Sequence, residues 1–462
     1  MTIAETKIAI SESSATEVVK AAIERAKADK SHALLEIIEE RAVVRAAEID
    51  EKLKAGSDAG ILAGVPFIAK DNMLTFGSHT TAASKLLENF EAPFQAEAIE
   101  RLEAAGAICI AKANLDAFAH GGSTENSAYG PTSNPHDNTR VAGGSSGGSA
   151  ASVALDIVPF ALGTDTGGSI REPASFCGVV GLKPTYGSVS RYGVVAMASS
   201  TDVIGPLTHT VGDAKLVMDV IAGKDTKDST TIDNPYTQPA TVAVKKVGVI
   251  KEWLEDGVDE TVKTNVTKML DTLTSQGYIV EEVSLPVLQY ALAVYYIIVP
   301  AEVASNLARY DGIRYGVRPE STTDLGSVYS MTRNAGFMPE NKRRILIGNY
   351  VLSSGYYDAY FRQAAKVRTL LTDVMNQALE TYDMLVGPTV PMVAFGLGEN
   401  TQDPLSMYLA DQMTVSASLT GMPAISVPLK TEGLPVGFQI IGKRGDDNSV
   451  LVFAETIEGA AV

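Results

Sequence analysis

Two glycine- and serine-rich stretches near the middle of the chain constrain its fold more than any other feature. One spans Val141 to Ala150 and reads VAGGSSGGSA, and the other spans Gly163 to Arg171 and reads GTDTGGSIR. The short apolar run VALDIVPFALG separates them. Glycine permits turns and close backbone approaches that other residues do not. The pattern therefore indicates functional loops carried by a buried sheet.

Helical and strand-like segments alternate around these stretches, as in α/β proteins. In chain order they are a helix opened by a capping box at Ser14 and Glu17, an amphipathic helix over 33–54, a short buried strand that runs into a polar loop over 64–72, a helix over 96–106 and a strand over 107–114. A mostly helical region follows over 284–380, and strand-like segments return near the end of the chain.

The charge balance argues against direct nucleic acid binding. The 462 residues carry a formal net charge of −17, and an acidic surface repels phosphate backbones. The dense basic cluster NKRRIL at 341–346 is interpreted as a solvated helix face. Neither a phosphate loop nor a dinucleotide-binding glycine motif occurs, so nucleotide binding is not expected either.

We expect a cytoplasmic protein without a membrane span. The longest apolar stretch, 291–304, is short for a span and is interrupted by Pro300. The first residues, MTIAETKIAI, do not resemble a signal peptide. Cys109 and Cys177 lie in apolar or glycine-rich surroundings, which predicts buried free thiols in a reducing compartment.

The serine-rich stretch matches G-x-S-x-G at Gly143–Gly147, with Ser145 in the centre. A hydrolase built on that motif needs a histidine further along the chain, and His209 is the only one that follows Ser145. The usual order of serine, acid and histidine is therefore hard to build.

Without a histidine, a serine nucleophile needs another base, and Lys70 is the candidate. A lysine becomes a base when burial lowers its pKa from about 10.4 toward neutrality. Lys70 follows the apolar run PFIA, although a single lysine is more often solvated. In the second stretch, the N–H groups of Thr166, Gly167, Gly168 and Ser169 can converge on an oxyanion. The alternative is a tight turn with an incidental serine.

Together, three motifs resemble the amidase signature family: KDN at Lys70, GGSSGGSAA at 143–151 and GTDTGGSIR at 163–171. The resemblance implies Ser169 as nucleophile, Ser145 as bridging serine after a cis peptide bond, and Lys70 as base. It also implies an α/β fold with a mixed central sheet flanked by helices on both faces.

The resemblance implies a single domain over 1–462. Within it we expect N-terminal helices over 1–60, a catalytic core over 61–235, a largely helical insertion over 236–390 and C-terminal strands over 391–462.

Longer stretches are similar to the glutamine-hydrolysing subunits of tRNA-dependent amidotransferases, a branch of this family. They include STENSAYGPTSNP, SNLARYDGIRYG and RRILIGNYVLSSGYYDAY. The similarity implies that Tyr295, Arg344 and Asp411 hold free glutamine, with Tyr296 and Arg343 as open alternatives. The assignment makes physical sense because glutamine is a zwitterion, which calls for both a cation and a carboxylate.

The same similarity implies a heterotrimer. A B subunit would bind tRNA and ATP with Mg²⁺, a small C subunit would bridge this chain and the B subunit, and this chain would hold neither a metal nor a cofactor. The expected activity is glutamine hydrolysis that supplies ammonia to convert Glu-tRNA(Gln) to Gln-tRNA(Gln). A stand-alone amidase of the same family is the alternative, and a non-catalytic scaffold is a third.

Overall fold

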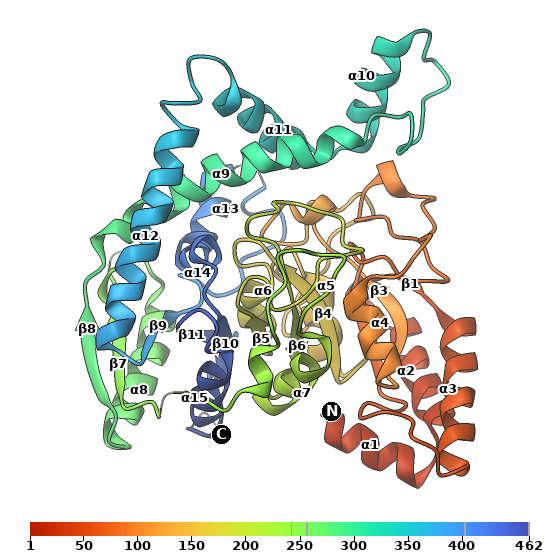
Figure 1. Ribbon diagram of the computed structural model, residues 1–462, viewed down its shortest axis with the longest axis horizontal. Coiled ribbons are helices and arrows are strands. Elements are labelled where there is room, and N and C mark those ends of the chain that lie inside the picture. Colours follow the sequence, from red (N-terminus) through yellow and green to blue (C-terminus); the bar gives the residue numbers. More distant parts are fainter. Residues whose placement is uncertain (242, 256, 402, 461–462) are drawn as a thin grey trace.

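One mixed sheet crosses the whole molecule in the computed structural model, which describes residues 1–460 apart from 242, 256 and 402 (Figure 1). Within those residues it has eleven strands in the order β1-β3-β2-β4-β6-β5-β10-β11-β9-β7-β8. Their bounds are β1 Leu34–Ile37, β2 Pro66–Lys70, β3 Ile108–Ala113, β4 Phe160–Asp165, β5 Val180–Lys183, β6 Val203–Thr208, β7 Lys246–Ile250, β8 Ile279–Val283, β9 Met384–Pro388, β10 Ala424–Leu429 and β11 Val436–Ile441.

Helices flank the sheet on both faces, as the family resemblance implies. They are α1 Ile3–Glu12, α2 Ala15–Lys27, α3 Glu39–Lys54, α4 Glu97–Ala104, α5 Gly147–Ala154, α6 Arg171–Cys177, α7 Val211–Ile221, α8 Glu260–Ser275, α9 Ala291–Asn306, α10 Leu325–Gly336, α11 Pro339–Leu352, α12 Phe361–Thr381, α13 Pro404–Leu409, α14 Val415–Thr420 and α15 Asp447–Ala460. Helices α5 and α6 contact one another and the central strands, while α7 and α15 contact one another and cover β6 and β10.

Strand pairing brings the two glycine-rich stretches beside Lys70. Strand β2 runs parallel to both β3 and β4, with Ala69 opposite Leu162. Parallel neighbours end at the same edge of a sheet, which is where ligands bind in α/β proteins. Lys70 at the end of β2 therefore lies beside the end of β4, from which the second stretch leaves.

The C-terminal part of the chain completes the same sheet. Strand β10 pairs antiparallel with β5, so that Ile425 lies opposite Leu182. Strands from both ends of the sequence thus share one hydrophobic core, which supports the proposal of a single domain over 1–462.

Most predicted elements are present, and two predictions need correction. Ser14 caps α2 by accepting from the Glu17 N–H, and the strands around Lys70 and Cys109 lie where the apolar runs predict them. The predicted helix over 33–54 begins instead with strand β1, because LLEI pairs with β3 far along the chain. Helix α1 precedes α2 within the N-terminal helices expected over 1–60, and the last element is the helix α15 rather than a strand.

Pro300 does not break the apolar stretch, because it lies inside α9. By length and by a mean hydropathy of 1.6, the helical segment Pro286–Arg309 would suffice to cross a membrane, so the expectation that it is too short is wrong. Half of its apolar window is buried inside the protein, where α9 packs against α11, α12 and α14. Figure 1 shows α9 and α11 side by side across one edge of the molecule. This packing outweighs the roughly 3 kcal/mol that an internal proline costs.

Gly348 on α11 sets the close approach of α11 to α9. A methyl group at this position would lie 1.9 Å from the Pro300 carbonyl oxygen. We expect Gly348→Ala to push the helices apart and to lower the free energy of unfolding by about 1–3 kcal/mol. Thermal and denaturant unfolding followed by circular dichroism measure this loss.

Gly212→Ala on α7 is the matched control, because no atom lies within 4 Å of the added methyl group. It should leave stability unchanged or raise it by at most about 1 kcal/mol. If both variants were equally stable, close packing at Gly348 would not limit the contact between α9 and α11.

Candidate active site

Lys70 is fully buried, and its side-chain partners are hydroxyl groups. Its Nζ donates to Ser145 Oγ at 2.7 Å, to Ser146 Oγ at 2.8 Å and to Thr164 Oγ1 at 3.0 Å. Asn72 supports this arrangement by donating to the same Thr164 hydroxyl at 3.1 Å. In the described part of the chain no carboxylate forms an ion pair with Lys70, so its amine faces the groups from which it can take a proton.

The surroundings of Lys70 favour the neutral amine. Burial lowers its pKa to about 7, against the opposing influence of the Asp116, Asp165 and Asp202 carboxylates. A general base works best with a pKa near the working pH. The electrostatics of Lys70 therefore suit the role that the family resemblance implies.

Two other fully buried lysines show why Lys70 is the base candidate. Lys112 forms an ion pair with the Asp71 carboxylate at 2.8 Å. Burial lowers the pKa of Lys183 to about 7 as well, but this lysine donates to the backbone carbonyls of Met422 and Pro184, at 2.7 and 3.1 Å. Lys70 differs from both because it combines a lowered pKa with serine hydroxyls that can exchange protons.

The first glycine-rich stretch places two serines against Lys70. The Gly144–Ser145 peptide bond is cis, as the resemblance implies, and the Ser145 hydroxyl accepts from the lysine. Sequence reasoning missed Ser146, whose hydroxyl accepts from Lys70 and donates to the Thr164 carbonyl at 3.2 Å. Its position beside Ser145 in the same motif was the available signal.

Ser169 lies beside these serines and is partly exposed. Its carbonyl accepts from the Ser146 N–H at 3.1 Å, which ties the two glycine-rich stretches together. Within the described residues its hydroxyl makes no hydrogen bond, so the link from Ser169 to Ser145 is not formed in this structure. Catalytic hydrogen bonds commonly tighten only when substrate is bound.

The loop before Ser169 presents a row of free N–H groups. In the part of the chain that the structure describes, the N–H groups of Thr166, Gly167, Gly168 and Ser169 donate no hydrogen bond. Glycine is required here, because a Cβ on Gly167 would lie 2.6 Å from the Tyr295 ring and one on Gly168 would lie 2.3 Å from the Thr414 hydroxyl. Such a loop can hold an oxyanion with its backbone.

A buried arginine holds this loop in place. Arg171 is fully buried and forms a forked ion pair with Asp165, with both distances 2.9 Å. It also donates to the Thr414 carbonyl at 2.9 Å and to Gln439 at 2.7 Å. Burial alone would raise the pKa of Asp165, but the Arg171 guanidinium lowers it below its usual range.

The residues expected to hold glutamine come together next to the loop, and both tyrosines of α9 take part. The Tyr295 ring packs on Gly167, and the Tyr296 hydroxyl donates to Asp411 Oδ2 at 2.9 Å. The Arg344 guanidinium lies 5.1 Å from the centre of the Tyr296 ring. Tyr296 therefore connects the predicted cation with the predicted carboxylate.

The two adjacent arginines differ in burial and in their partners. Arg344 is 3% exposed and binds Glu340 Oε1 through Nε at 2.8 Å, whereas the Arg343 side chain is 42% exposed. The basic cluster at 341–346 is therefore not simply a solvated helix face. Asp411 is partly buried, and burial raises the pKa of its carboxyl group to about 6, opposed by Arg344 and Tyr296.

Two cavities lie near the catalytic loop. One of about 480 Å³ is lined by Arg344, Tyr408 and Met407 together with Asp116 and Gly122. Its size and mixed lining suit a small polar ligand.

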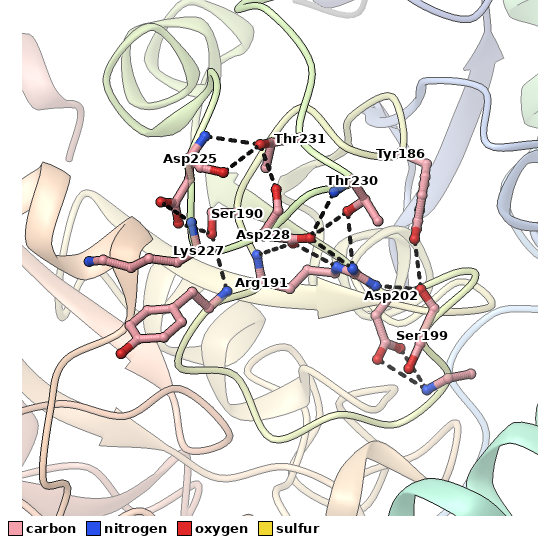
Figure 2. A network of polar contacts seen from close by, with 12 residues as sticks. Tyr186, Ser190, Arg191, Ser199, Asp202, Asp225, Lys227, Asp228, Thr230 and Thr231 are labelled. Carbon is pink, nitrogen blue, oxygen red and sulfur yellow. Dashed lines mark hydrogen bonds and ion pairs between the residues drawn. The ribbon is translucent and has the colours of Figure 1, made fainter.

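The other cavity, of about 240 Å³, is lined by Thr164 and Thr166 from the catalytic region and by Arg191 and Asp202. Figure 2 shows the polar network at its rim, where Arg191 binds Asp228 through Nε and Nη2 at 2.9 and 3.0 Å.

The alternative triad and a metal centre find no support in the described residues. His209 lies 3.0 Å from Asp156 rather than beside Ser145. Among those residues no group of three or more histidine, cysteine, aspartate or glutamate side chains could hold a metal ion. Cys109 and Cys177 are buried free thiols, as expected.

Comparisons with known proteins identify the family. The sequence profile of the amidase family matches residues 17–451. The chain belongs to this amidase family. The A subunit of a glutamyl-tRNA(Gln) amidotransferase from Carboxydothermus hydrogenoformans is 51% identical over 460 residues, which cover 98% of this chain and 95% of the relative.

Solved amidase structures share the fold over nearly the full length. The A subunit of a glutamyl-tRNA(Gln) amidotransferase from Thermotoga maritima matches with a TM-score of 0.81 and 40% identity, over 99% of this chain and 94% of the other. A protein described as an amidase matches with a TM-score of 0.85 and 32% identity, over the full length of both chains.

Lys70 predicts a pH dependence of amide hydrolysis. Only the neutral amine can accept a proton, so the rate should rise with pH and level off above the Lys70 pKa of about 7. Lys70→Arg keeps the cation but cannot deprotonate, and should lower the rate by on the order of 10³-fold. Steady-state hydrolysis measured across pH 5.5–9 tests both statements.

The surface variant Lys215→Arg on α7 should leave the pH profile unchanged. A folded Lys70→Arg enzyme with wild-type activity would contradict the role of Lys70 as base.

Proposed function

We propose that this chain is the glutamine-hydrolysing subunit of a tRNA-dependent amidotransferase. It releases ammonia from glutamine for the conversion of Glu-tRNA(Gln) to Gln-tRNA(Gln). The observation that carries the proposal is the joining of Arg344 and Asp411 through Tyr296, directly beside the oxyanion loop that Tyr295 contacts. The near-full-length similarity to the amidotransferase chains of Carboxydothermus hydrogenoformans and Thermotoga maritima supports it.

Glutamine suits this arrangement because its two charged groups lie at one end of the molecule. Its α-carboxylate matches the forked Arg344 guanidinium, and its α-ammonium matches the Asp411 carboxylate. The side-chain carboxamide then extends toward Ser169. A simple amide would use neither charge, and the buried Arg344 would have no role in its recognition.

In the proposed mechanism, neutral Lys70 takes a proton from Ser145, which takes one from Ser169. The Ser169 Oγ attacks the carboxamide carbon, and the N–H groups of Thr166 to Ser169 stabilise the oxyanion. The relay returns the proton to the departing nitrogen, and ammonia leaves as the carbon–nitrogen bond breaks. Water then hydrolyses the acyl-enzyme ester, which releases glutamate and restores the Ser169 hydroxyl.

The proposal includes partner subunits in the cytoplasm. A B subunit binds tRNA and ATP with Mg²⁺, and a C subunit joins it to this chain in a heterotrimer. The net charge of −17 fits a chain that leaves tRNA to its partner. No cofactor is needed for the amide hydrolysis itself, since the lysine and the serines supply every proton transfer.

A stand-alone amidase of the same family is the second candidate, since a protein described as an amidase shares the fold over its full length. The two functions differ in substrate preference and in the need for partners. A strong preference for glutamine, with activity raised by partner subunits, favours the first.

Ser169→Ala tests the nucleophile. Glutamine hydrolysis should fall by on the order of 10³-fold or more, because the attacking oxygen is absent. In the assembled complex, added ammonium should still support formation of Gln-tRNA(Gln). Glutamate release and tRNA amidation are measured in parallel.

Ser152→Ala on α5 removes another buried hydroxyl, one that bonds only within its own helix, and should retain activity. Near-normal glutamine hydrolysis by Ser169→Ala would rule out Ser169 as nucleophile.

Asp411→Asn tests the recognition of the α-ammonium. Loss of a buried charged contact costs roughly 2–5 kcal/mol, which is about 30-fold or more in kcat/KM. The loss should be large for glutamine and small for glutaramate, which lacks the α-amino group. Arg344→Lys should show the opposite pattern and spare 4-aminobutanamide, which lacks the α-carboxylate. An equal loss of kcat/KM on all three substrates would contradict the assignment of both residues.

A further inference from the structure

Glu172, in the first turn of α6, is a buried carboxyl group without a side-chain partner among the described residues. It is fully buried, and within the described residues neither of its carboxyl oxygens accepts or donates a hydrogen bond. Buried polar groups are nearly always satisfied, because an unpaired one costs free energy. The neighbouring Arg171 does not neutralise Glu172, since its guanidinium binds the Asp165 carboxylate. Glu172 therefore calls for a ligand.

The Glu172 carboxyl group lies next to Gly122, which lines the cavity that contains Arg344. A Cβ on Gly122 would lie 3.5 and 3.6 Å from its two oxygens and 3.7 Å from the Met407 sulfur. Gly122 and Met407 both line the 480 Å³ cavity. The unpaired oxygens thus lie next to the lining of the space in which the charged end of the substrate would lie.

The charges around Glu172 are negative. Burial raises the pKa of its carboxyl group well above the usual range, the carboxylates of Asp411 and Asp116 raise it further, and the nearby Gly144 N–H opposes them. Arg344, the buried cation of this region, is paired with Glu340 instead. A cation placed between Glu172 and Asp411 would remove their repulsion, so the pair is suited to a positively charged ligand.

We propose that Glu172 and Asp411 together bind the α-ammonium of glutamine, which makes Glu172 a specificity-determining residue for α-amino amides. The inference rests on the proposed function. An ammonium group has three N–H donors. Asp411 uses Oδ2 to accept from Tyr296, which leaves Oδ1, and Glu172 supplies two more free oxygens. Three donors therefore meet three open acceptors.

An acid in the first turn of a helix also interacts favourably with the helix dipole. That purely structural role would stabilise α6 but would not distinguish one amide substrate from another. The two roles are separated by comparing glutamine with glutaramate, because glutaramate keeps the carboxylate and the reacting amide but lacks the ammonium.

Glu172→Gln keeps the size and polarity of the side chain and removes its charge. In the complex with partner subunits, we expect the KM for glutamine to rise at least about tenfold, with kcat changed less than threefold. For glutaramate both constants should stay within about twofold. The surface variant Glu24→Gln should change neither substrate's constants.

An unchanged ratio of kcat/KM for the two substrates would overturn the role of Glu172, and so would an equal loss on both with a lowered melting temperature. If Glu172→Gln does not fold, Glu172→Asp, which keeps the charge on a shorter side chain, must still lower the ratio several-fold. A wild-type enzyme without any preference for glutamine over glutaramate would overturn the proposed function itself, and this inference with it.

Discussion

The buried Arg171 guanidinium is the interaction on which the rest of the site depends. All five of its N–H donors are used: two on Asp165, one on Ser418, one on the Thr414 carbonyl and one on Gln439. An unpaired buried guanidinium would cost several kcal/mol, so these partners must be in place together. They come from β4, from the segment around α14 and from β11, which are far apart in the sequence. One side chain thus joins the catalytic loop to the C-terminal part of the sheet.

The same pairing occupies the Asp165 carboxylate, one of the charges near Lys70. Asp165 lies close enough to influence Lys70, but its carboxylate is already bound to Arg171. Lys70 therefore contacts hydroxyls at hydrogen-bonding distance and feels carboxylates only from further away. The effect of burial is larger than that of the carboxylates, and it lowers the pKa of the Lys70 amine to about 7. Lys112, by contrast, has the Asp71 carboxylate in direct contact at 2.8 Å.

Helix α9 couples the glycine-rich loop to the charges proposed to bind glutamine through two adjacent residues. The rings of Tyr295 and Tyr296 meet edge to face, with centroids 5.1 Å apart, and point to different partners. Tyr295 lies against Gly167, whereas Tyr296 binds Asp411 and stacks on Tyr408 at 3.9 Å. The close contact of α9 with Gly348 on α11 keeps Arg344, one turn earlier, in reach of the same rings. Distant packing and the proposed recognition of glutamine are therefore linked in one helix pair.

The sequence by itself determined the features that rest on neighbouring residues. The strand before Lys70, the glycine loops, the Ser14 cap and the α/β alternation follow from apolar runs and backbone freedom over a few positions. The tertiary structure decided what depends on distant partners. Strand β1 forms because β3 lies beside it, and Pro300 stays helical because α11 packs on α9. Neighbouring residues in the sequence also do not predict three features of the site. These are the environment of Lys70, the different exposure of Arg343 and Arg344, and the open carboxyl group of Glu172. Burial and charge are set by side chains that lie apart in the sequence, and only the folded chain brings them together.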